Sequence, residues 1–275
     1  MKVVTFGCSL TRYNWPTWAS ILLTQAELHG YETDNWGCPG TGNFYIAMHI
    51  QEAIARKLIQ PGDHVIICWA SFLREDRFVS GNNPRWLGAG NIFGDHSLKH
   101  AHDQNWVDRF ANVNFSLYRD LTLIQSTQHS LDQLGVVHSH FKAYDYIEVR
   151  DGSNDKLIAE LDSTFNLKFD YSDLMPFLIR QEKIKITPVE TQFNVSLKSV
   201  ADVHPRPEHH LTFVKKCMLS NNKHAWLDQL DPTIEAWVES EQLRIHNLPK
   251  PLNANTHPLP AFKTEPWQLT GESFQ

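Results

Sequence analysis

Short apolar runs alternate with amphipathic stretches over the first 70 residues of the chain. Residues 3–7 and 64–70 form apolar runs typical of buried strands, and residues 31–35 form a further candidate strand. Between them, residues 16–30 and 43–59 place apolar side chains at helical spacing. The alternation of strand and helix predicts a parallel α/β sheet with right-handed crossovers.

The pattern changes after residue 71. Residues 72–104 are rich in Gly, Asn, Asp and His without a clear period, and they are interpreted as a long insertion or lid. A helix is predicted over about 105–133, and "VVHSHF" (136–141) is a fourth candidate strand. Residues 145–200 are interpreted as an elaboration of the same domain, with a helix around 171–181.

The C-terminal quarter of the sequence predicts a helix entered from "HPRPEHH", another helix near 223–241, and then a Pro-rich segment. Prolines recur too often after residue 246 for a continuous helix, so this segment is expected to be extended. We therefore predict one α/β domain over 1–243, with insertions at about 72–104 and 145–200. A C-terminal tail follows over 244–275.

Charge and composition exclude several classes of protein. The net charge is −6 and no block of Lys or Arg forms a stripe, which argues against a nucleic-acid partner. No apolar run approaches the roughly 18 residues that cross a bilayer, and the N-terminus lacks the pattern of a secretory signal. We expect a cytoplasmic protein without a membrane partner, and the sequence leaves incorporation into a larger particle open. Its four cysteines are expected to be reduced and buried, with a contact between Cys8 and Cys38 left open.

Chemistry-bearing residues gather in the loops that follow the predicted strands, where doubly wound sheets bind their ligands. These loops are "FGCSLT", "NWGCPGTGN" and "WASFLRED", and "ADVHPRPEHH" precedes a helix much later in the chain. Taken alone, Ser9 fits a turn or helix-cap residue, and the glycines fit a tight turn. Together the loops supply a small nucleophile, glycine N–H groups and an Asp–His pair.

This order of loops resembles the SGNH, or GDSL-type, hydrolase superfamily. Ser9 in "FGCSLT" stands at the place of that family's nucleophilic serine, and Cys8 stands where Asp is usual. The spacing of "NWGCPG" matches the second block, so Gly40 takes the role of an oxyanion donor, with Asn35 and Gly37 shaping the turn. "DVHP" pairs Asp202 with His204 and is one residue shorter than the family's usual last block.

The third block departs from the family pattern. An oxyanion-hole Asn normally follows the third strand, but this chain has Ser71 and Phe72 there. Ser71 is the candidate replacement donor, and the residues predicted to line the pocket are Cys8, Asn35, Gly37, Asn43, Trp69 and Arg74. The alternative is that Trp69 belongs to the core and that Arg74 pairs outside the pocket with Glu75 or Asp76. Loss of one such donor typically costs about 100- to 1000-fold in rate.

The resemblance implies a three-layer, flavodoxin-like parallel sheet with helices on both faces and a C-terminal extension. It also implies acyl transfer through Ser9, with His204 as base, Asp202 orienting His204, and the N–H groups of Ser9 and Gly40 holding the oxyanion. The predicted function is a serine esterase, with acetyl or other acyl esters of a carbohydrate as the candidate substrates. The alternatives are a weakly active or inactive binding protein of the same fold and an O-acyltransferase. Cys8 is a weaker candidate nucleophile, because a residue just before the turn usually points away from the pocket.

The remaining histidines have plainer interpretations. His209 and His210 are expected on the helix that follows "HPRP". His96 and His100 have the spacing of metal ligands on one helix face, but no further ligand set supports them, so "GDHSLKHAHD" is interpreted as a solvated loop. We predict no metal and no cofactor, and the tail is left open as a contact for a protein partner.

Overall fold

The structure of the protein is a computed structural model. It describes residues 1–79, 85–93, 102–145, 155–186, 189–192, 200–202, 204–220, 223–247, 252–253 and 259–266.

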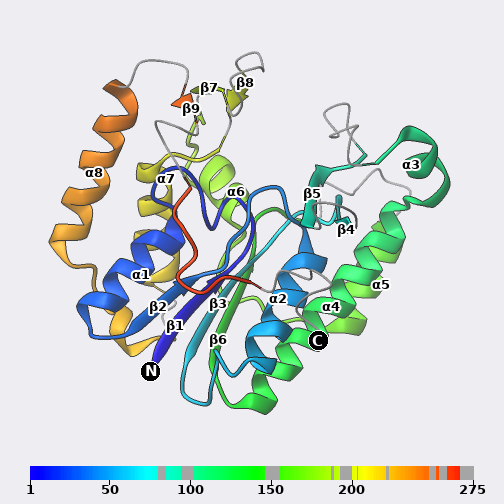
Figure 1. The fold of residues 1–275 in the computed structure, drawn as a ribbon, viewed down its shortest axis with the longest axis horizontal. Coiled ribbons are helices and arrows are strands. Elements are labelled where there is room, and N and C mark those ends of the chain that lie inside the picture. The colour runs from blue at the N-terminus through cyan, green and yellow to red at the C-terminus, as the bar shows by residue number, and fades with distance from the viewer. Residues whose placement is uncertain are drawn as a thin grey trace.

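A four-stranded parallel sheet forms the centre of the molecule (Figure 1). Its strands are β1 (Lys2–Phe6), β2 (Glu32–Asn35), β3 (His64–Trp69) and β6 (Val137–Lys142), in the order β2-β1-β3-β6. Every side chain of β3 is buried, as expected for a strand covered on both faces. The chain leaves β1 for β2 on one side and returns to β3 on the other, so the predicted α/β class is confirmed and the switch point lies beside β1.

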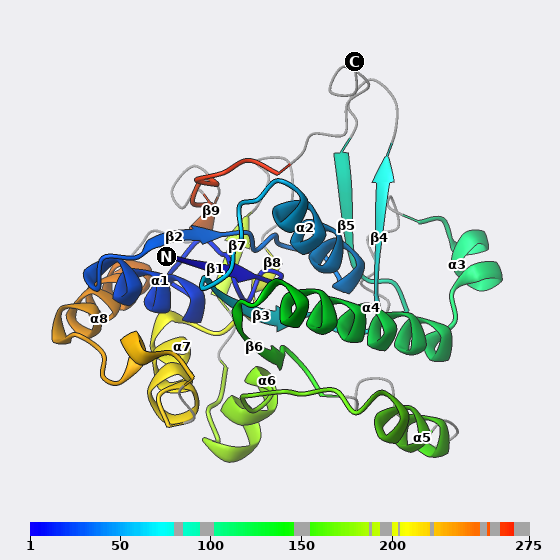
Figure 2. The same cartoon turned by 90° about the horizontal axis from the view of Figure 1, so that it is seen from below.

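Helices cover both faces of this sheet (Figure 2). One layer holds α1 (Trp18–Leu28), α7 (Pro207–Phe213) and α8 (Pro232–Asn247), and the opposite layer holds α2 (Asn43–Ala55) and α4 (Val113–Leu134). Trp18 and Phe141 meet edge to face in the core between α1 and the sheet, with ring centroids 4.9 Å apart. The predicted three layers are therefore present.

The predicted insertion at 72–104 is more ordered than its composition suggests. It contains an antiparallel hairpin of β4 (Arg74–Val79) and β5 (Arg85–Asn91). The buried Asp76 carboxylate anchors the hairpin by accepting the N–H groups of Gly42 at 2.7 Å and Tyr45 at 2.8 Å, at the start of α2. Burial raises the pKa of Asp76 to about 6, although these two hydrogen bonds favour the ionised form.

The single helix predicted over 105–133 is two helices, α3 (Gln104–Phe110) and α4. Ala111 has extended backbone, and the Asn112 side chain accepts the Phe115 N–H at 2.9 Å as the N-cap of α4. A good capping residue in the middle of a helical pattern therefore marks a break.

The later elements partly follow the predictions. α5 (Asp155–Phe165) was not predicted, and the predicted helix at 171–181 is α6 (Leu174–Pro176) continued by the π-helical turn η2 (Phe177–Gln181). α7 likewise continues into the π-helical turn η3 (Val214–Met218). The predicted helix near 223–241 is the short 3₁₀ turn η4 (Ala225–Leu227) followed by α8. α8 runs to Asn247, past the predicted start of the tail at 244.

A second small sheet lies beyond the carboxyl ends of the central strands (Figure 1). It has the order β8-β7-β9, from β7 (Val189–Gln192), β8 (Val200–Asp202) and β9 (Leu252–Asn253). The predicted tail thus contributes a strand to the fold.

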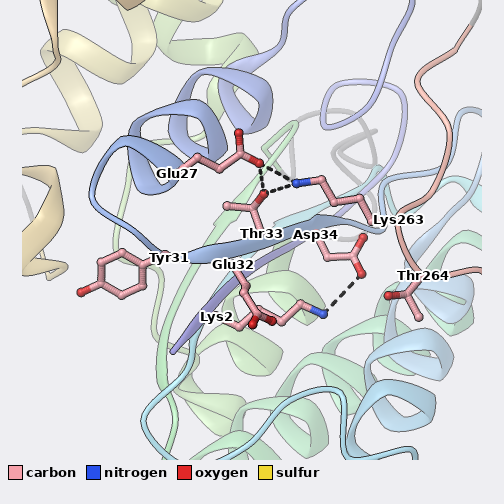
Figure 3. Close-up of a pocket in the computed structure, with 8 residues that line it drawn as sticks. All are labelled: Lys2, Glu27, Tyr31, Glu32, Thr33, Asp34, Lys263 and Thr264. Atoms are coloured by element: carbon pink, nitrogen blue, oxygen red, sulfur yellow. Dashed lines mark hydrogen bonds and ion pairs between the residues drawn. The ribbon is translucent and has the colours of Figure 1, made fainter.

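Residues 259–266 of the tail lie beside β2, the edge strand of the central sheet. Figure 3 shows the Lys263 ammonium between Glu27 and Thr33, at 2.5 and 2.7 Å from their side-chain oxygens. Because an uncovered edge strand invites pairing with another chain, this segment protects the edge of the sheet.

The four cysteines are free; Cys8, Cys68 and Cys217 are buried as predicted, whereas Cys38 is partly exposed. Within the ranges given above, no helix has both the length and the apolar character needed to cross a bilayer.

Candidate active site

The turn that carries Ser9 follows β1 directly. The N–H groups of Thr11 and Arg12 both donate to the Cys8 carbonyl, at 3.0 and 3.2 Å, and close a tight turn around Ser9. A Cβ on Gly7 would lie 2.0 Å from the Thr11 hydroxyl oxygen, so only glycine fits at the entry to this turn. Ser9 is 4% exposed and lies at the carboxyl end of β1, beside the switch point of the sheet.

His204 comes from a part of the chain far from Ser9, yet its Nε2 lies 2.8 Å from the Ser9 hydroxyl oxygen. The imidazole ring stacks on Tyr13, with centroids 4.2 Å apart and planes 19° apart. The adjoining Pro205 carbonyl accepts the Trp15 indole N–H at 2.8 Å. The segment that follows Ser9 therefore also holds the histidine in place.

Asp202 is the last residue of β8, and its backbone places it just before His204. The Asp202 side chain lies outside the described residues. The structure thus brings two members of the predicted triad into contact, and the role of Asp202 stays a prediction.

The second block forms a turn that is tied to the first. The Asn35 side chain accepts the Gly37 N–H at 3.0 Å and donates to the Thr11 carbonyl at 3.2 Å. A Cβ on Gly37 would lie 2.8 Å from the Arg12 Cβ, so the two turns are in direct contact. Gly40 has φ +80°, in the region that favours glycine, and its neighbour across the gap is Gly88 of the hairpin.

Two backbone N–H groups in these turns remain available as donors. Within the described part of the chain, neither the Ser9 nor the Gly40 N–H has a hydrogen-bond acceptor. Buried backbone donors are almost always paired, so the unpaired N–H of the buried Ser9 is typical of a binding site, whereas Gly40 is partly exposed. Both N–H groups are the ones predicted to hold an oxyanion.

The residues predicted around the third block mostly hold the scaffold together. The Ser71 hydroxyl accepts the Leu73 N–H at 3.2 Å, and one Arg74 guanidinium nitrogen donates to the Thr41 carbonyl at 2.7 Å. Arg74 therefore reaches the second block and steadies its end. The donor role predicted for Ser71 stays a prediction.

Trp69 and Asn43, two predicted pocket residues, are fully buried. The Trp69 indole N–H donates to His140 Nδ1 at 3.1 Å, so Trp69 occupies the core position that was the alternative interpretation. The Asn43 amide accepts the Ala70 N–H at 2.7 Å and donates to Asp120 at 2.8 Å. Asn43 thus joins the start of α2 to the end of β3 and serves the scaffold.

Cys8 is fully buried, in keeping with the expectation that the residue before the turn points away from the pocket. Burial raises the pKa of the neighbouring Cys38 thiol. His209 and His210 lie on α7, as expected. Burial lowers the pKa of His210 to about 3, so this ring binds a proton too weakly to serve as the base for Ser9.

Arg12, Tyr13 and Trp15 are site residues that the sequence analysis missed. Two of them support His204, and Arg12 contacts both turns and the tail. The dense aromatic and basic cluster "TRYNW", directly after the candidate nucleophile, was the signal that could have identified them.

The histidine-rich loop lies mostly outside the described residues, including His96 and His100. His102 stacks on Trp106 at 4.4 Å, and Asp103 caps α3 by accepting the Trp106 N–H at 2.7 Å. Among the residues that the structure describes, no group of three or more His, Cys, Asp or Glu side chains is placed to hold a metal ion.

Comparisons with known proteins give distant structural matches. No protein-family model and no curated protein sequence matches this chain. One similar solved structure is a member of the lipolytic protein G-D-S-L family from Veillonella parvula, with 16% identity, 78% of this chain and 93% of that chain covered, and a TM-score of 0.37. Another is a catalytic mutant of an acetylxylan esterase from Geobacillus stearothermophilus, with 12% identity, 82% and 95% covered, and a TM-score of 0.41. A putative G-D-S-L lipolytic protein from Desulfitobacterium hafniense has 12% identity, 77% and 94% covered, and a TM-score of 0.40.

Proposed function

We propose that this protein is a serine hydrolase of SGNH type that cleaves acyl esters. The observation that carries the proposal is the 2.8 Å contact between the Ser9 hydroxyl and His204 Nε2, across nearly 200 residues of sequence. Nucleophile and base must lie within hydrogen-bond reach, which is roughly 2.6–3.2 Å.

The proposed reaction begins with transfer of the Ser9 proton to His204 Nε2 as Oγ attacks the ester carbonyl carbon. The alcohol then leaves with the proton held by His204, and an acyl group remains on Ser9. Water attacks this acyl-enzyme with His204 again as base, which releases the carboxylic acid and restores Ser9. Asp202 is proposed to accept the His204 Nδ1–H and hold the ring in the required tautomer.

The negative charge of the tetrahedral intermediate falls on the former carbonyl oxygen. The Ser9 and Gly40 N–H groups are the proposed donors to this oxygen, because both lack an acceptor among the described residues. No Asn follows β3, so we expect a rate below that of a site with all three donors.

The substrate is proposed to be a small acyl ester, with an acetyl group on a carbohydrate as the finer proposal. Tyr13 is buried and stacks on the His204 ring, so it supports the proposed base.

Hydrolysis of p-nitrophenyl acetate tests the proposal. We expect measurable turnover by the wild-type protein, loss of that turnover in Ser9→Ala, and a loss of at least about 1000-fold in His204→Ala. The variants His210→Phe and Ser139→Ala are controls, because each alters a buried His or Ser outside the proposed chemistry. Equal rates in the wild type and Ser9→Ala would contradict the proposal.

A second candidate is a binding protein on the same fold with little or no activity. It is favoured by the absence of an Asn after β3, where Ser71 turns its oxygen to the Leu73 N–H. Folded wild-type protein that neither hydrolyses the ester nor reacts with a fluorophosphonate would support this candidate.

A further inference from the structure

The Arg12 side chain is buried between the two turns of the candidate site and the C-terminal segment. It is 6% exposed, and its Nε donates to the Pro260 carbonyl at 2.8 Å, where Nη2 donates as well. Nη1 donates to the Gly37 carbonyl at 3.3 Å. The guanidinium carbon lies 3.7 Å from the centroid of the Phe262 ring.

These contacts compensate a buried charge without a carboxylate. Across the described residues, no ion pair within 4.0 Å joins Arg12 to Asp or Glu. The guanidinium therefore depends on two carbonyl oxygens and one aromatic face, and residues 259–266 supply all of these except the Gly37 carbonyl. Hydrogen bonds from an ionised donor are roughly twice as strong as neutral ones. Since the segment accepts two of these three hydrogen bonds and also supplies the aromatic ring, it contributes the larger share of the compensation.

The same segment is fastened to the sheet beyond this point. Lys263 binds Glu27 and Thr33 beside β2, as Figure 3 shows, and the Glu265 carbonyl accepts from Arg56 at 2.9 Å. Arg56 follows α2, on the far side of β2 from α1. The segment is thus anchored to both helical layers, with the Arg12 contact at its start.

Arg12 is also part of the turn that positions Ser9. Its N–H donates to the Cys8 carbonyl at 3.2 Å, and its Cβ faces Gly37 so closely that any other side chain at 37 would clash. A shift of Arg12 therefore moves the nucleophile turn and the glycine turn relative to one another. Displacements of about 1 Å at a catalytic group can cost on the order of 100-fold in rate.

We propose that Arg12 is a positioning residue and that residues 259–266 form a C-terminal strap that holds the Ser9 turn and the Gly37–Gly40 turn together. The consequence for catalysis rests on the proposed function, whereas the mechanical coupling between strap and turns does not.

Hydrogen exchange tests the coupling. We compare the wild type with Arg12→Ala and with Phe262→Ala, which alters the strap alone, and we use Phe115→Ala as a control because Phe115 is 59% exposed on α4. Backbone N–H groups at 8–13 and 36–41 should exchange at least about 3-fold faster in Arg12→Ala and Phe262→Ala and at the wild-type rate in Phe115→Ala, since cation–π contacts of this kind contribute modestly. Unchanged exchange at both turns in Phe262→Ala would overturn the strap.

The rate of fluorophosphonate labelling per folded molecule tests the positioning role. We expect a loss of about 10- to 100-fold in Arg12→Ala, partial recovery in Arg12→Lys, and a loss of about 3- to 10-fold in Phe262→Ala. Per folded molecule, we expect kcat for ester hydrolysis to fall with little change in KM. A smaller folded fraction alone would leave both constants unchanged once rates are expressed per folded molecule. Wild-type labelling in Arg12→Ala would overturn the positioning role. An unlabelled wild type with faster exchange in the variants would overturn the proposed function and support the strap.

Discussion

Two histidine–serine pairs lie in different parts of the same fold. His204 Nε2 is 2.8 Å from the Ser9 hydroxyl, and His224 Nε2 is 3.1 Å from the Ser139 hydroxyl. Ser139 lies inside β6, where its backbone pairs with Ile66 of the neighbouring strand, and both it and His224 are fully buried. Ser9 lies in a turn after its strand, and His204 is only half-buried.

The difference between the pairs teaches what a catalytic contact requires. The second nitrogen of His224 is occupied by His64, 2.8 Å away, so this pair is closed into a core network. The Ser9 N–H has no acceptor in the described chain, whereas Ser139 has its backbone committed to the sheet. A serine and a histidine in contact therefore indicate a site only where a substrate oxygen can also be held.

The largest expected effect is the difference in esterase activity between the Ser9→Ala and Ser139→Ala variants. Ser9→Ala should lower kcat/KM for p-nitrophenyl acetate by at least about 10⁴-fold, because it removes the nucleophile. Ser139→Ala should stay within about 3-fold of the wild type. Steady-state kinetics of both variants at matched folded fraction measure the gap, and a gap below about 10-fold would contradict the comparison.

A smaller loss of activity is expected from Gly40→Ala. Gly40 has φ +80°, and an added Cβ would lie 3.2 Å from the Gly88 carbonyl oxygen, so the turn must shift and carry its N–H away from the oxyanion. We expect kcat to fall about 10- to 100-fold with little change in KM. Gly62→Ala also has positive φ but open space around the Cβ, and it serves as the control for backbone strain alone. Equal kcat in the two variants would remove Gly40 from the proposed oxyanion hole.

The contribution of the buried His224–Ser139 pair to the free energy of unfolding is expected to depend on pH. Burial lowers the pKa of His224 to about 3, well below its ordinary value of about 6.5. The unfolded chain then binds more protons at His224 between these values, so the contribution of this residue to stability falls as pH falls from about 6.5 toward 3. In His224→Phe the loss of unfolding free energy should be largest near pH 8 and should shrink by up to about 1.4 kcal/mol per pH unit below 6.5. Urea unfolding at several pH values measures this, and a loss independent of pH would contradict it.

The smallest expected effect is the change in the free energy of unfolding caused by Ser139→Ala. Ser139→Ala should lower the free energy of unfolding by about 1 kcal/mol at pH 7.5, because it leaves the buried His224 Nε2 without its partner. Ser9→Ala should change it less, since His204 is half-buried and can bind water instead. The same urea experiment compares the two variants, and a larger loss in Ser9→Ala would reverse the interpretation.

The central strands could be predicted because each carries its signal locally. The apolar runs at 3–7 and 64–70 correspond to β1 and β3, and 136–141 corresponds to β6. The hairpin at 74–91 was missed because charged and small residues fill it, and it is held by bonds from the start of α2 to its own Asp76. The break at Asn112 was missed because the helical period continues across it.

The site was predictable where short motifs carry it and unpredictable where distant contacts do. The order of the motifs identified Ser9, Gly40 and His204 as candidate site residues. Ser9 and His204 lie in contact in the structure. Trp69 was predicted to line the pocket because it ends a strand, but its ring is buried in the hydrophobic core. The bond from Arg12 to Pro260 spans almost the whole chain, and no local pattern of either residue indicates it.

The account rests most directly on which serine reacts. The protein is treated with a fluorophosphonate at pH 7.5, digested with trypsin, and the labelled peptide is identified by mass spectrometry. We predict a single label on Ser9, in the peptide between Lys2 and Arg12, and none on Ser139. Folded protein without a label on Ser9, or with a label on another serine in its place, would contradict the account.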